Sequence, residues 1–400
     1  MSKNRVTYQA QGAFIGPAII SGSHNTNKDP YSIERIQALT YSFNIDRADI
    51  VQLGKMGLVT RPIIEHPTVD IELTYLQASF TNEEAIGFNF NLQSGVYGEP
   101  QRTGNFECSL ISGFTNTGDR NLDRKNIYVT VQEREGIDAF NHLSGSGYWD
   151  PNERTDVIGI SNCFLHRYSS RGAIGSPIEN SISFQGSDIN YFKSMELSLD
   201  PVKMPVVNYK DTTGLLEKEV WIEPYTATGE TTILKPGDIS IDLEQIKTNP
   251  TGGSNIGISL NEMKLQGYTI EISLNREKLR GIGFKVPIDY PIVEPATATI
   301  ALEALVSDAE AGSLAEIRNY DDEYNIDVNI FKSTYCPTGE GDPEVVSYLT
   351  NAFMFRRAKL ERANFNSDLG SSKNVSLGFM VDLDNEDMTK GLFLSGQVNP

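Results

Sequence analysis

The side chains best suited to catalysis or metal binding are few and widely spaced in the sequence. The four histidines are His24, His66, His142 and His166. None of them stands in an HExxH motif or another metal-ligand spacing, so solvated or partly packed imidazoles are expected. The three cysteines are Cys108, Cys163 and Cys336. They form no CxxC pair, which indicates reduced thiols without a catalytic or metal role.

Glycine-rich and acidic segments also depart from the motifs that bind cofactors or cations. Gly281 and Gly283 begin a GxGxxG pattern, but Val286 stands where the third glycine of a dinucleotide site belongs. Acidic clusters within residues 321–327 and 382–387 lack the glycine and the distant glutamate of an EF-hand. We therefore expect no catalytic residue, no bound cofactor and no metal. A hydrolase on a β scaffold stays open, because paired carboxylates for glycoside hydrolysis are compatible with so acidic a chain.

The composition narrows the class of protein further. The chain has 34 basic and 53 acidic residues, for a formal net charge of −19. Proteins that grip nucleic acid need clustered Lys and Arg, so this balance argues against that function. A length of 400 residues fits two ordinary domains. No apolar run approaches the roughly 20 residues that cross a bilayer, and the N-terminus lacks a signal-peptide core, so we expect synthesis in the cytoplasm and no membrane partner.

An internal repeat is the strongest signal in the sequence. Residues 36–76 align without gaps on residues 265–305, 229 positions further on. Eleven of the 41 positions are identical, against about three expected from ordinary residue usage. The identical pairs are Gln37/Gln266, Thr40/Thr269, Arg47/Arg276, Gly54/Gly283, Pro62/Pro291, Ile63/Ile292, Glu65/Glu294, Thr68/Thr297, Ile71/Ile300, Leu73/Leu302 and Leu76/Leu305.

Two shorter similarities follow in the same order. Residues 126–131 (NIYVTV) resemble residues 325–330 (NIDVNI), and residues 162–167 (NCFLHR) resemble residues 351–356 (NAFMFR). The offset falls along the chain, so the first copy carries about 30 extra residues within 88–124, a stretch that reads as a long loop or hairpin. We interpret the chain as a tandem duplication, with a first domain over 1–205, a linker over 206–230 and a second domain over 231–400.

Alternation of apolar and polar side chains predicts β-strands in both copies. The apolar positions of the first alternating strand are Leu39, Tyr41, Phe43 and Ile45, and their counterparts are Tyr268, Ile270, Ile272 and Leu274. This period of two predicts half-buried strands with one apolar face and one wet face. A short helix is expected near residues 82–86 and another over 308–317. The predicted fold class is mainly β, with two tandem β-sandwich or barrel domains that each carry one short helix.

Two segments resemble the tail tube proteins of long-tailed bacteriophages. The first is residues 39–47 (LTYSFNIDR), followed by Gly54, Arg61, Pro62 and a strand through Leu73. The second is residues 169–184 (SSRGAIGSPIENSISF), which is similar to the late strand pair of that fold. The resemblance covers most of both copies and implies a virion structural protein, not an enzyme.

In that family, ring-forming β-domains stack into a hollow tail tube through which DNA passes. Two such domains in one chain imply a homotrimeric ring with pseudo-sixfold symmetry, assembled in the host cytoplasm and located in the virion tail. The implied partners are other copies of the chain and other tail proteins, and DNA passes without specific binding because an acidic or neutral lumen repels phosphates. The candidates for lumen-facing residues are Thr40, Ser42, Asn44, Asp70, Glu72, Thr269, Glu271, Ser273 and Glu303.

Two other classes of protein remain open. A baseplate, tail-terminator, connector or capsid-decoration protein would be built on a similar barrel. A tandem β-sandwich binding module would expose aromatic side chains on loops, for which Tyr148 and Trp149 are the suggestive pair.

Overall fold

The structure, a computed structural model, consists mainly of antiparallel β-strands. It describes residues 11–17, 31–64, 67–91, 108–111, 114, 124–132, 155–195, 203–205, 219–221, 239–246, 256–258, 264–279, 281, 290–305, 322–336, 344–366, 374–383 and 387–396. These ranges contain eighteen strands and one short helix. The predicted mainly β fold class is therefore confirmed.

The described strands fall into two halves, and a small two-stranded ribbon lies between the halves in the sequence. The strands of the first half are β1 (Gln11–Pro17), β2 (Tyr31–Ser32), β3 (Ile36–Asn44), β4 (Thr68–Leu76), β5 (Lys125–Gln132), β6 (Thr155–Ala173), β7 (Glu179–Gly186) and β8 (Asp188–Met195). Those of the second half are β11 (Ile239–Ile246), β12 (Ile256–Ile258), β13 (Lys264–Ser273), β14 (Ala296–Leu305), β15 (Glu323–Cys336), β16 (Glu344–Asn366), β17 (Asn374–Leu383) and β18 (Gly391–Gly396). The ribbon is a separate pair of β9 (Lys203–Pro205) and β10 (Glu219–Trp221).

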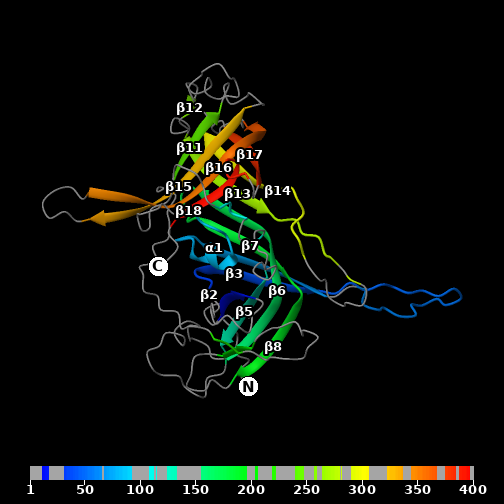
Figure 1. The fold of residues 1–400 in the computed structure, drawn as a ribbon. Helices are drawn as coiled ribbons and strands as arrows, with labels where there is room; N and C mark the ends of the chain where they lie inside the picture. Colours follow the sequence, from blue (N-terminus) through cyan, green and yellow to red (C-terminus); the bar gives the residue numbers. More distant parts are fainter. Residues whose placement is uncertain are drawn as a thin grey trace, which may run out of the picture.

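The same order of strand pairing occurs in both halves. In the first, β3, β4, β7 and the C-terminal part of β6 lie side by side; in the second, β13, β14, β17 and the C-terminal part of β16 do so. The two sets join because β6 pairs with β13, and the eight strands form what we call the central sheet. The N-terminal parts of β6 and β16 extend into the outer strands β1, β2, β5 and β8, or β11, β12, β15 and β18, at opposite ends of the molecule (Figure 1).

Both long strands bend at a residue in the left-handed backbone region. Asn162 of β6 has φ of 50° and Arg357 of β16 has φ of 57°. The backbone N–H of Asn162 donates a hydrogen bond to Oδ1 of Asn126, and that of Arg357 donates to Oδ1 of Asn325, each over 3.3 Å. An amide side chain on the neighbouring strand thus stabilises the bend in each half. This contact explains why asparagine stands at the start of both predicted segments, 126–131 and 325–330.

The third sequence similarity was aligned in the wrong register. Lys125 pairs with Cys163 and Tyr324 pairs with Ala358, so Asn162 corresponds to Arg357 and not to Asn351. The two alignments differ by six residues, an even number. Because side chains alternate with a period of two, an even slip leaves the apolar pattern intact and a sequence comparison does not detect it.

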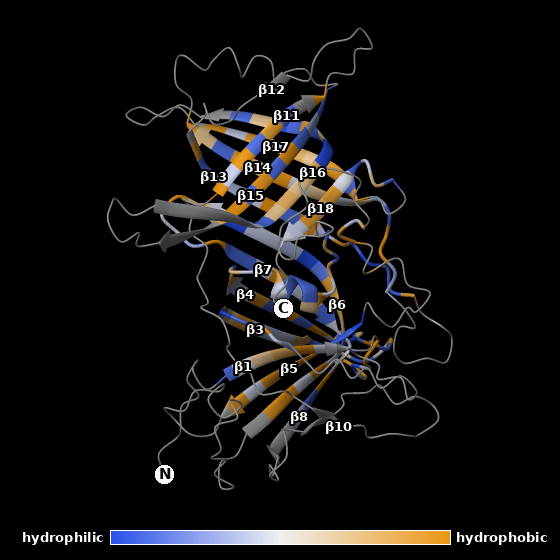
Figure 2. Cartoon of the chain, turned by 60° about the vertical axis from the view of Figure 1, so that its left-hand side comes forward, coloured by the Kyte–Doolittle hydropathy of each residue, from blue (hydrophilic) through white to orange (hydrophobic). Residues whose placement is uncertain are grey.

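A single hydrophobic cluster runs through both halves. In β4 the inward residues Val69, Ile71, Leu73 and Tyr75 are buried, whereas Glu72 on the other face is exposed. Strand β14 repeats this alternation, and Figure 2 shows it as blue and orange bands along the strands of the second half. Both strands therefore show the period of two that is typical of a strand with one buried face.

The helix α1 (Thr81–Ile86) forms where the first helix was predicted and ends at Gly87, whose φ of 115° suits a residue without a side chain. The second candidate helix, 308–317, lies outside the described residues. Parts of the predicted insertion reach the second half: the N–H of Asn91 donates to the carbonyl of Leu394 over 2.8 Å, and that of Leu110 to Leu392 over 3.2 Å. The insertion therefore adds to the edge of β18 and links the two halves.

Candidate functional site

The side chains suited to catalysis do not gather in the described part of the chain. Cys163 is buried, which raises the pKa of its thiol far above the ordinary range. Burial lowers the pKa of His166, and the nearby charge of Arg276 lowers it further. Within the described residues, no group of three or more His, Cys, Asp or Glu side chains is placed to hold a metal ion. His24, His66 and His142 lie outside these residues.

Two described carboxylates of the acidic clusters, those of Asp327 and Asp387, make local contacts. Asp327 forms an ion pair with Arg356, and Asp387 accepts hydrogen bonds from the N–H and the hydroxyl of Thr389 over 2.9 and 2.6 Å.

No helix in the ranges that the structure describes is long and apolar enough to cross a membrane.

The nine residues predicted to face a lumen lie on one face of the central sheet. Directly paired residues share a face, and the pairing runs from Thr40 to Glu72, then to Ser183, Arg167 and Ser273. A second line of pairs joins Ser42 to Asp70, and Glu303 pairs with Gly267 on the same face of the second half. None of the nine is buried. We call this surface the polar face.

Basic residues on the polar face were missed in the sequence. Arg167 and Arg171 of β6 are exposed there. Arg167 forms a 2.7 Å ion pair with Glu271 of β13, and Arg171 lies opposite Glu179 of β7. The alternation of β6 around residues 164–171 carries the signal that would have found them. It was not assigned a face because the strand partners of β6 come from distant parts of the chain.

The junction between β6 and β13 joins the halves through backbone pairing and close packing. Seven residue pairs are in register, from Gly267 with Ala173 to Ser273 with Arg167. Tyr268 lies against Gly172, where an added Cβ would come within 2.5 Å of the tyrosine ring. Ile272 pairs with Tyr168 on the buried side.

Arg276 closes the end of this junction. Its Nε donates a hydrogen bond to the carbonyl of Leu165 over 3.0 Å, and its Nη1 donates to the carbonyl of Tyr290 over 2.8 Å. The guanidinium also lies over the ring of Phe164, at 5.3 Å from its centroid. The N–H of Leu274 donates to the carbonyl of His166 over 2.8 Å. Arg276 of the second half thus binds the backbone of β6 in the first half.

Strand β3 is an open edge of the central sheet. Among the described strands it pairs with β4 alone. Tyr41, Phe43 and Ile45 are 38%, 45% and 40% exposed, whereas their counterparts Ile270, Ile272 and Leu274 of β13 are 0%, 0% and 1% exposed. The prediction of a half-buried strand with one apolar face toward the core holds for β13 but is wrong for Tyr41, Phe43 and Ile45 in the first copy. The difference arises because β6 lies beside β13 and no described strand lies on the outer side of β3.

The opposite edge is the C-terminal part of β16. Residues 362–366 pair with β17, and no described strand pairs on their other side. Residues 361–364 are exposed. In the first half the corresponding segment of β6 is the one covered by β13. Among the described strands, β3 and the C-terminal part of β16 are therefore the two edges of the central sheet, each paired on one side only. Such edges are templates for pairing with another chain.

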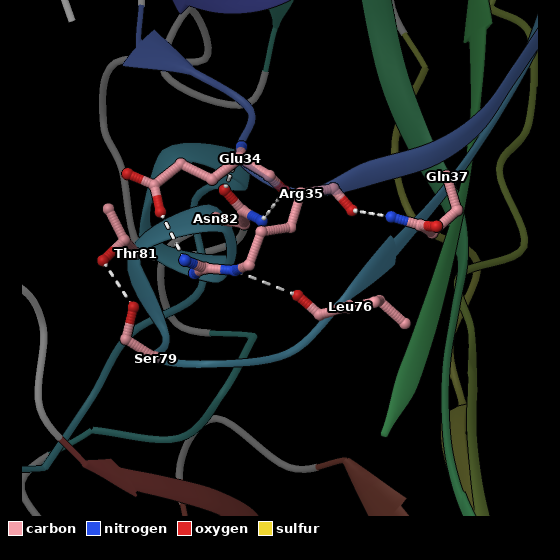
Figure 3. Close-up of polar contacts among 7 residues, drawn as sticks. All are labelled: Glu34, Arg35, Gln37, Leu76, Ser79, Thr81 and Asn82. Carbon is pink, nitrogen blue, oxygen red and sulfur yellow. Dashed lines mark hydrogen bonds and ion pairs between the residues drawn. The ribbon is translucent and has the colours of Figure 1, made fainter. Parts of the chain in front are cut away.

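The start of β3 is fixed to helix α1 by a network of polar contacts (Figure 3). The backbone N–H of Glu34 donates to Oδ1 of Asn82 over 3.0 Å, and Nδ2 of Asn82 donates to the carbonyl of Glu34 over 3.1 Å. Arg35 forms a 2.8 Å ion pair with Glu34, and its Nε donates to the carbonyl of Leu76 over 3.3 Å. These contacts hold the edge strand in place without a neighbour on its outer side.

A hairpin arm, residues 45–64, extends β3 and β4 away from the body of the molecule (Figure 1). It turns at Gly54, whose φ is 87°, where the N–H of Lys55 donates to the carbonyl of Gln52 over 3.1 Å. The arm carries exposed apolar side chains, Ile50, Val51, Leu53, Met56, Leu58, Val59, Ile63 and Ile64. A patch of this kind marks an interaction surface.

No protein-family model matches the sequence, and no curated protein matches it. A chain of one solved structure is similar to it: the six-fold symmetrised cryo-EM structure of the anti-feeding prophage (AFP) baseplate. The identity is 14% and the TM-score is 0.25, and the match covers 40% of this chain and 94% of that chain. A likeness at this TM-score carries no argument about function.

Proposed function

We propose that the chain is a virion structural subunit of the phage tail-tube type, without catalytic activity, which assembles by β-strand addition. The C-terminal part of β16 of one copy pairs with β3 of the next. The observation that carries the proposal is the contrast between β3 and β13. The same apolar positions are exposed on β3 and buried on β13, and β13 differs in having a partner strand on that side.

The junction inside the chain supplies the register of the contact between copies. Residues 38–44 of β3 correspond to residues 267–273 of β13, and the pairing with β7 and β17 equates Arg167 with Arg362. Arg362 then pairs with Asn44 of the next copy, Ala363 with Phe43, and Asn364 with Ser42. Inside the chain a large Tyr168 lies beside Ile272; between copies a small Ala363 lies beside the larger Phe43. Phe43 is larger than Ile272, so it offsets part of the volume lost between Tyr168 and Ala363.

Strand addition at both edges closes a ring in which no edge of the central sheet remains unpaired. Each chain contributes two sets of four strands in the same order, so three chains form a ring with pseudo-sixfold symmetry. Closed heterologous contacts produce rings of this kind and avoid open-ended aggregation. Stacked rings form a tail tube that other tail proteins cap, and this places the protein in the virion after assembly in the host cytoplasm.

The polar face is then the wall of the lumen, and its charges suit a surface that DNA slides along. Acidic residues on this face are Asp70, Glu72, Glu179, Glu271, Glu303 and Asp382. The basic residues on this face are Arg167, Arg171, Lys359 and Arg362. Arg167 forms an ion pair with Glu271, and Arg171 lies opposite Glu179. The acidic residues outnumber the basic ones, so the wall as a whole repels phosphates.

The test is negative-stain electron microscopy of the purified protein over a concentration series. We expect pore-bearing rings or hollow rods with threefold or pseudo-sixfold symmetry, and the fraction of protein in them rising with concentration. Rings that never stack would indicate a baseplate, terminator, connector or decoration protein. A compact monomer at every concentration would contradict strand addition and favour the binding module.

A further inference from the structure

We propose that Arg47 is the residue that fastens one copy to the next. Its Nε donates a hydrogen bond to the carbonyl of Leu360 of the neighbouring copy, as Arg276 does to Leu165 inside the chain. This inference rests on the proposed strand addition and identifies one of its specific contacts. It assigns a positioning role to a side chain that is exposed on the hairpin arm.

Arg47 and Arg276 already share half of their contacts. Nη1 of Arg47 donates to the carbonyl of Arg61 over 3.1 Å, and Nη1 of Arg276 donates to the carbonyl of Tyr290 over 2.8 Å. Position 61 corresponds to position 290 in the ungapped alignment of the two copies. The two guanidinium groups are therefore held by the same backbone bond at the base of their hairpins.

Arg276 makes a second hydrogen bond to a backbone carbonyl, and Arg47 does not make one within the described residues. Nε of Arg276 reaches the carbonyl of Leu165 over 3.0 Å, but Nε of Arg47 has no acceptor within the described residues. A guanidinium that binds one carbonyl has donors left for a second acceptor. The missing acceptor is what the next copy supplies.

Strand β16, which would supply the carbonyl of Leu360, has the same kind of register shift as β6. The pairing of β6 with β7 shifts between Leu165 and Arg167, and that of β16 with β17 shifts between Leu360 and Arg362. In β6 the carbonyls of Leu165 and His166, at this bulge, accept bonds from the neighbouring strand and its hairpin. The bulge in β16 places the carbonyl of Leu360 in the same position at the open edge, where no described strand covers it.

The aromatic part of the Arg276 site is not repeated. Phe164 stacks on Tyr290 with 4.6 Å between ring centroids, whereas Lys359 and Arg61 stand at the corresponding positions. Arg61 is held by a 2.6 Å ion pair with Asp49, which offsets one of these charges. The contact between copies thus depends on the backbone carbonyl and not on ring stacking, and Arg47→Ala removes that whole contribution.

The experiment compares full-length wild type, Arg47→Ala, Arg47→Lys, and the matched control Arg61→Ala, which removes an exposed arginine from the same arm. Sedimentation velocity over a concentration series gives the concentration of half-assembly, and thermal unfolding of dilute protein reports the fold. A lost hydrogen bond from a charged donor raises the half-assembly concentration of Arg47→Ala about tenfold or more. Arg47→Lys lacks the guanidinium fork and is expected to recover little. The melting temperature of both Arg47 variants stays at the wild-type value.

Arg276→Ala provides the comparison inside the chain, and we expect it to lower the melting temperature even in dilute protein. Half-assembly of Arg47→Ala at the wild-type concentration, or an equal shift in Arg61→Ala, would overturn the role of Arg47 while leaving strand addition standing. A wild-type protein that remains monomeric would overturn both. A large shift confined to the Arg47 variants would support the contact.

Discussion

The hydroxyl of Tyr75 donates a 2.7 Å hydrogen bond to Oε1 of Glu83, a carboxyl group that is fully buried under the central sheet. The same oxygen accepts bonds from the hydroxyl of Tyr168 over 3.1 Å and from Nδ2 of Asn180 over 2.7 Å. One side chain of α1 therefore ties the helix to β4, β6 and β7. Because β6 carries the junction to the second half, this carboxyl group supports the edge-to-edge continuity of the sheet.

Replacing Glu83 with alanine is expected to destabilise the fold strongly. Three buried donors would lose their acceptor, and each unsatisfied group costs about 1–3 kcal/mol. We expect Glu83→Ala to lower the free energy of unfolding by about 3 kcal/mol or more, and Glu83→Gln to lower it clearly less, because the amide keeps an oxygen acceptor. Urea unfolding followed by tyrosine fluorescence and circular dichroism measures both. Equal losses in the two variants would contradict this role of the oxygen.

Stability should also depend on pH through this group. Burial raises the pKa of Glu83 above its ordinary value, although hydrogen bonds from Tyr75, Tyr168 and Asn180 lower it in part. The folded state then holds the proton more tightly than the unfolded state, whose Glu pKa is about 4.3. The advantage of wild type over Glu83→Gln is therefore largest below about pH 4 and declines as the pH rises through the raised pKa. Unfolding at a series of pH values tests this, and an advantage that grows with pH would have the wrong sign.

The positions of several strands and of α1 could be predicted from the sequence. The pairing between strands that are far apart in the sequence could not. The alternation of β4 and β14 and the position of α1 follow from local patterns of apolar and acidic residues. The repeat itself predicted which residues share a face. These features depend on a few neighbouring residues, which is why the sequence contains them.

The junction between β6 and β13 and the exposed side of β3 depend on non-local pairing. Nothing in the residues 39–45 distinguishes an edge strand from a central one, because both copies have the same alternation. The role of the insertion was also hidden, since Asn91 and Leu110 use backbone groups to reach β18 and any sequence carries such groups. The open edges that now support the proposed function could only be seen once the pairing was known.

Matched substitutions on β3 and β13 should separate assembly from folding. Phe43 and Ile272 are counterparts, but only Ile272 is buried. We expect Ile272→Ala to lower the free energy of unfolding by about 2–4 kcal/mol, as truncation in a core does. Phe43→Ala should change it by no more than about 0.5 kcal/mol and yet impair ring formation. Chemical unfolding and sedimentation of the same samples provide the two measurements. Wild-type assembly of Phe43→Ala would argue that β3 is not the contact edge.

Close packing at the junction predicts a different effect for two glycines of the central sheet. A Cβ on Gly172 would lie 2.5 Å from the buried ring of Tyr268, whereas one on Gly378 would meet its nearest atom at 3.6 Å. We expect Gly172→Ala to destabilise the protein by about 1–3 kcal/mol through overpacking, and Gly378→Ala to be close to neutral. Differential scanning calorimetry of both variants checks this. A neutral Gly172→Ala would mean that the two halves adjust their spacing easily.

The register between copies can be tested by a disulfide that no single chain can form. Phe43 and Ala363 lie on the two open edges of the central sheet, and the β6–β13 pairing places them opposite each other only when two copies meet. Disulfides require Cα atoms within about 7 Å, so a slip of register prevents the bond. The double variant Phe43→Cys/Ala363→Cys should therefore form ladders of covalent dimers and trimers on mild oxidation, seen on a non-reducing gel, with the trimer closing as a circle. Each single variant is the control for background pairing through the native cysteines. Efficient cross-linking of Phe43→Cys/Glu361→Cys in place of this pair would place the neighbouring strand in a different register.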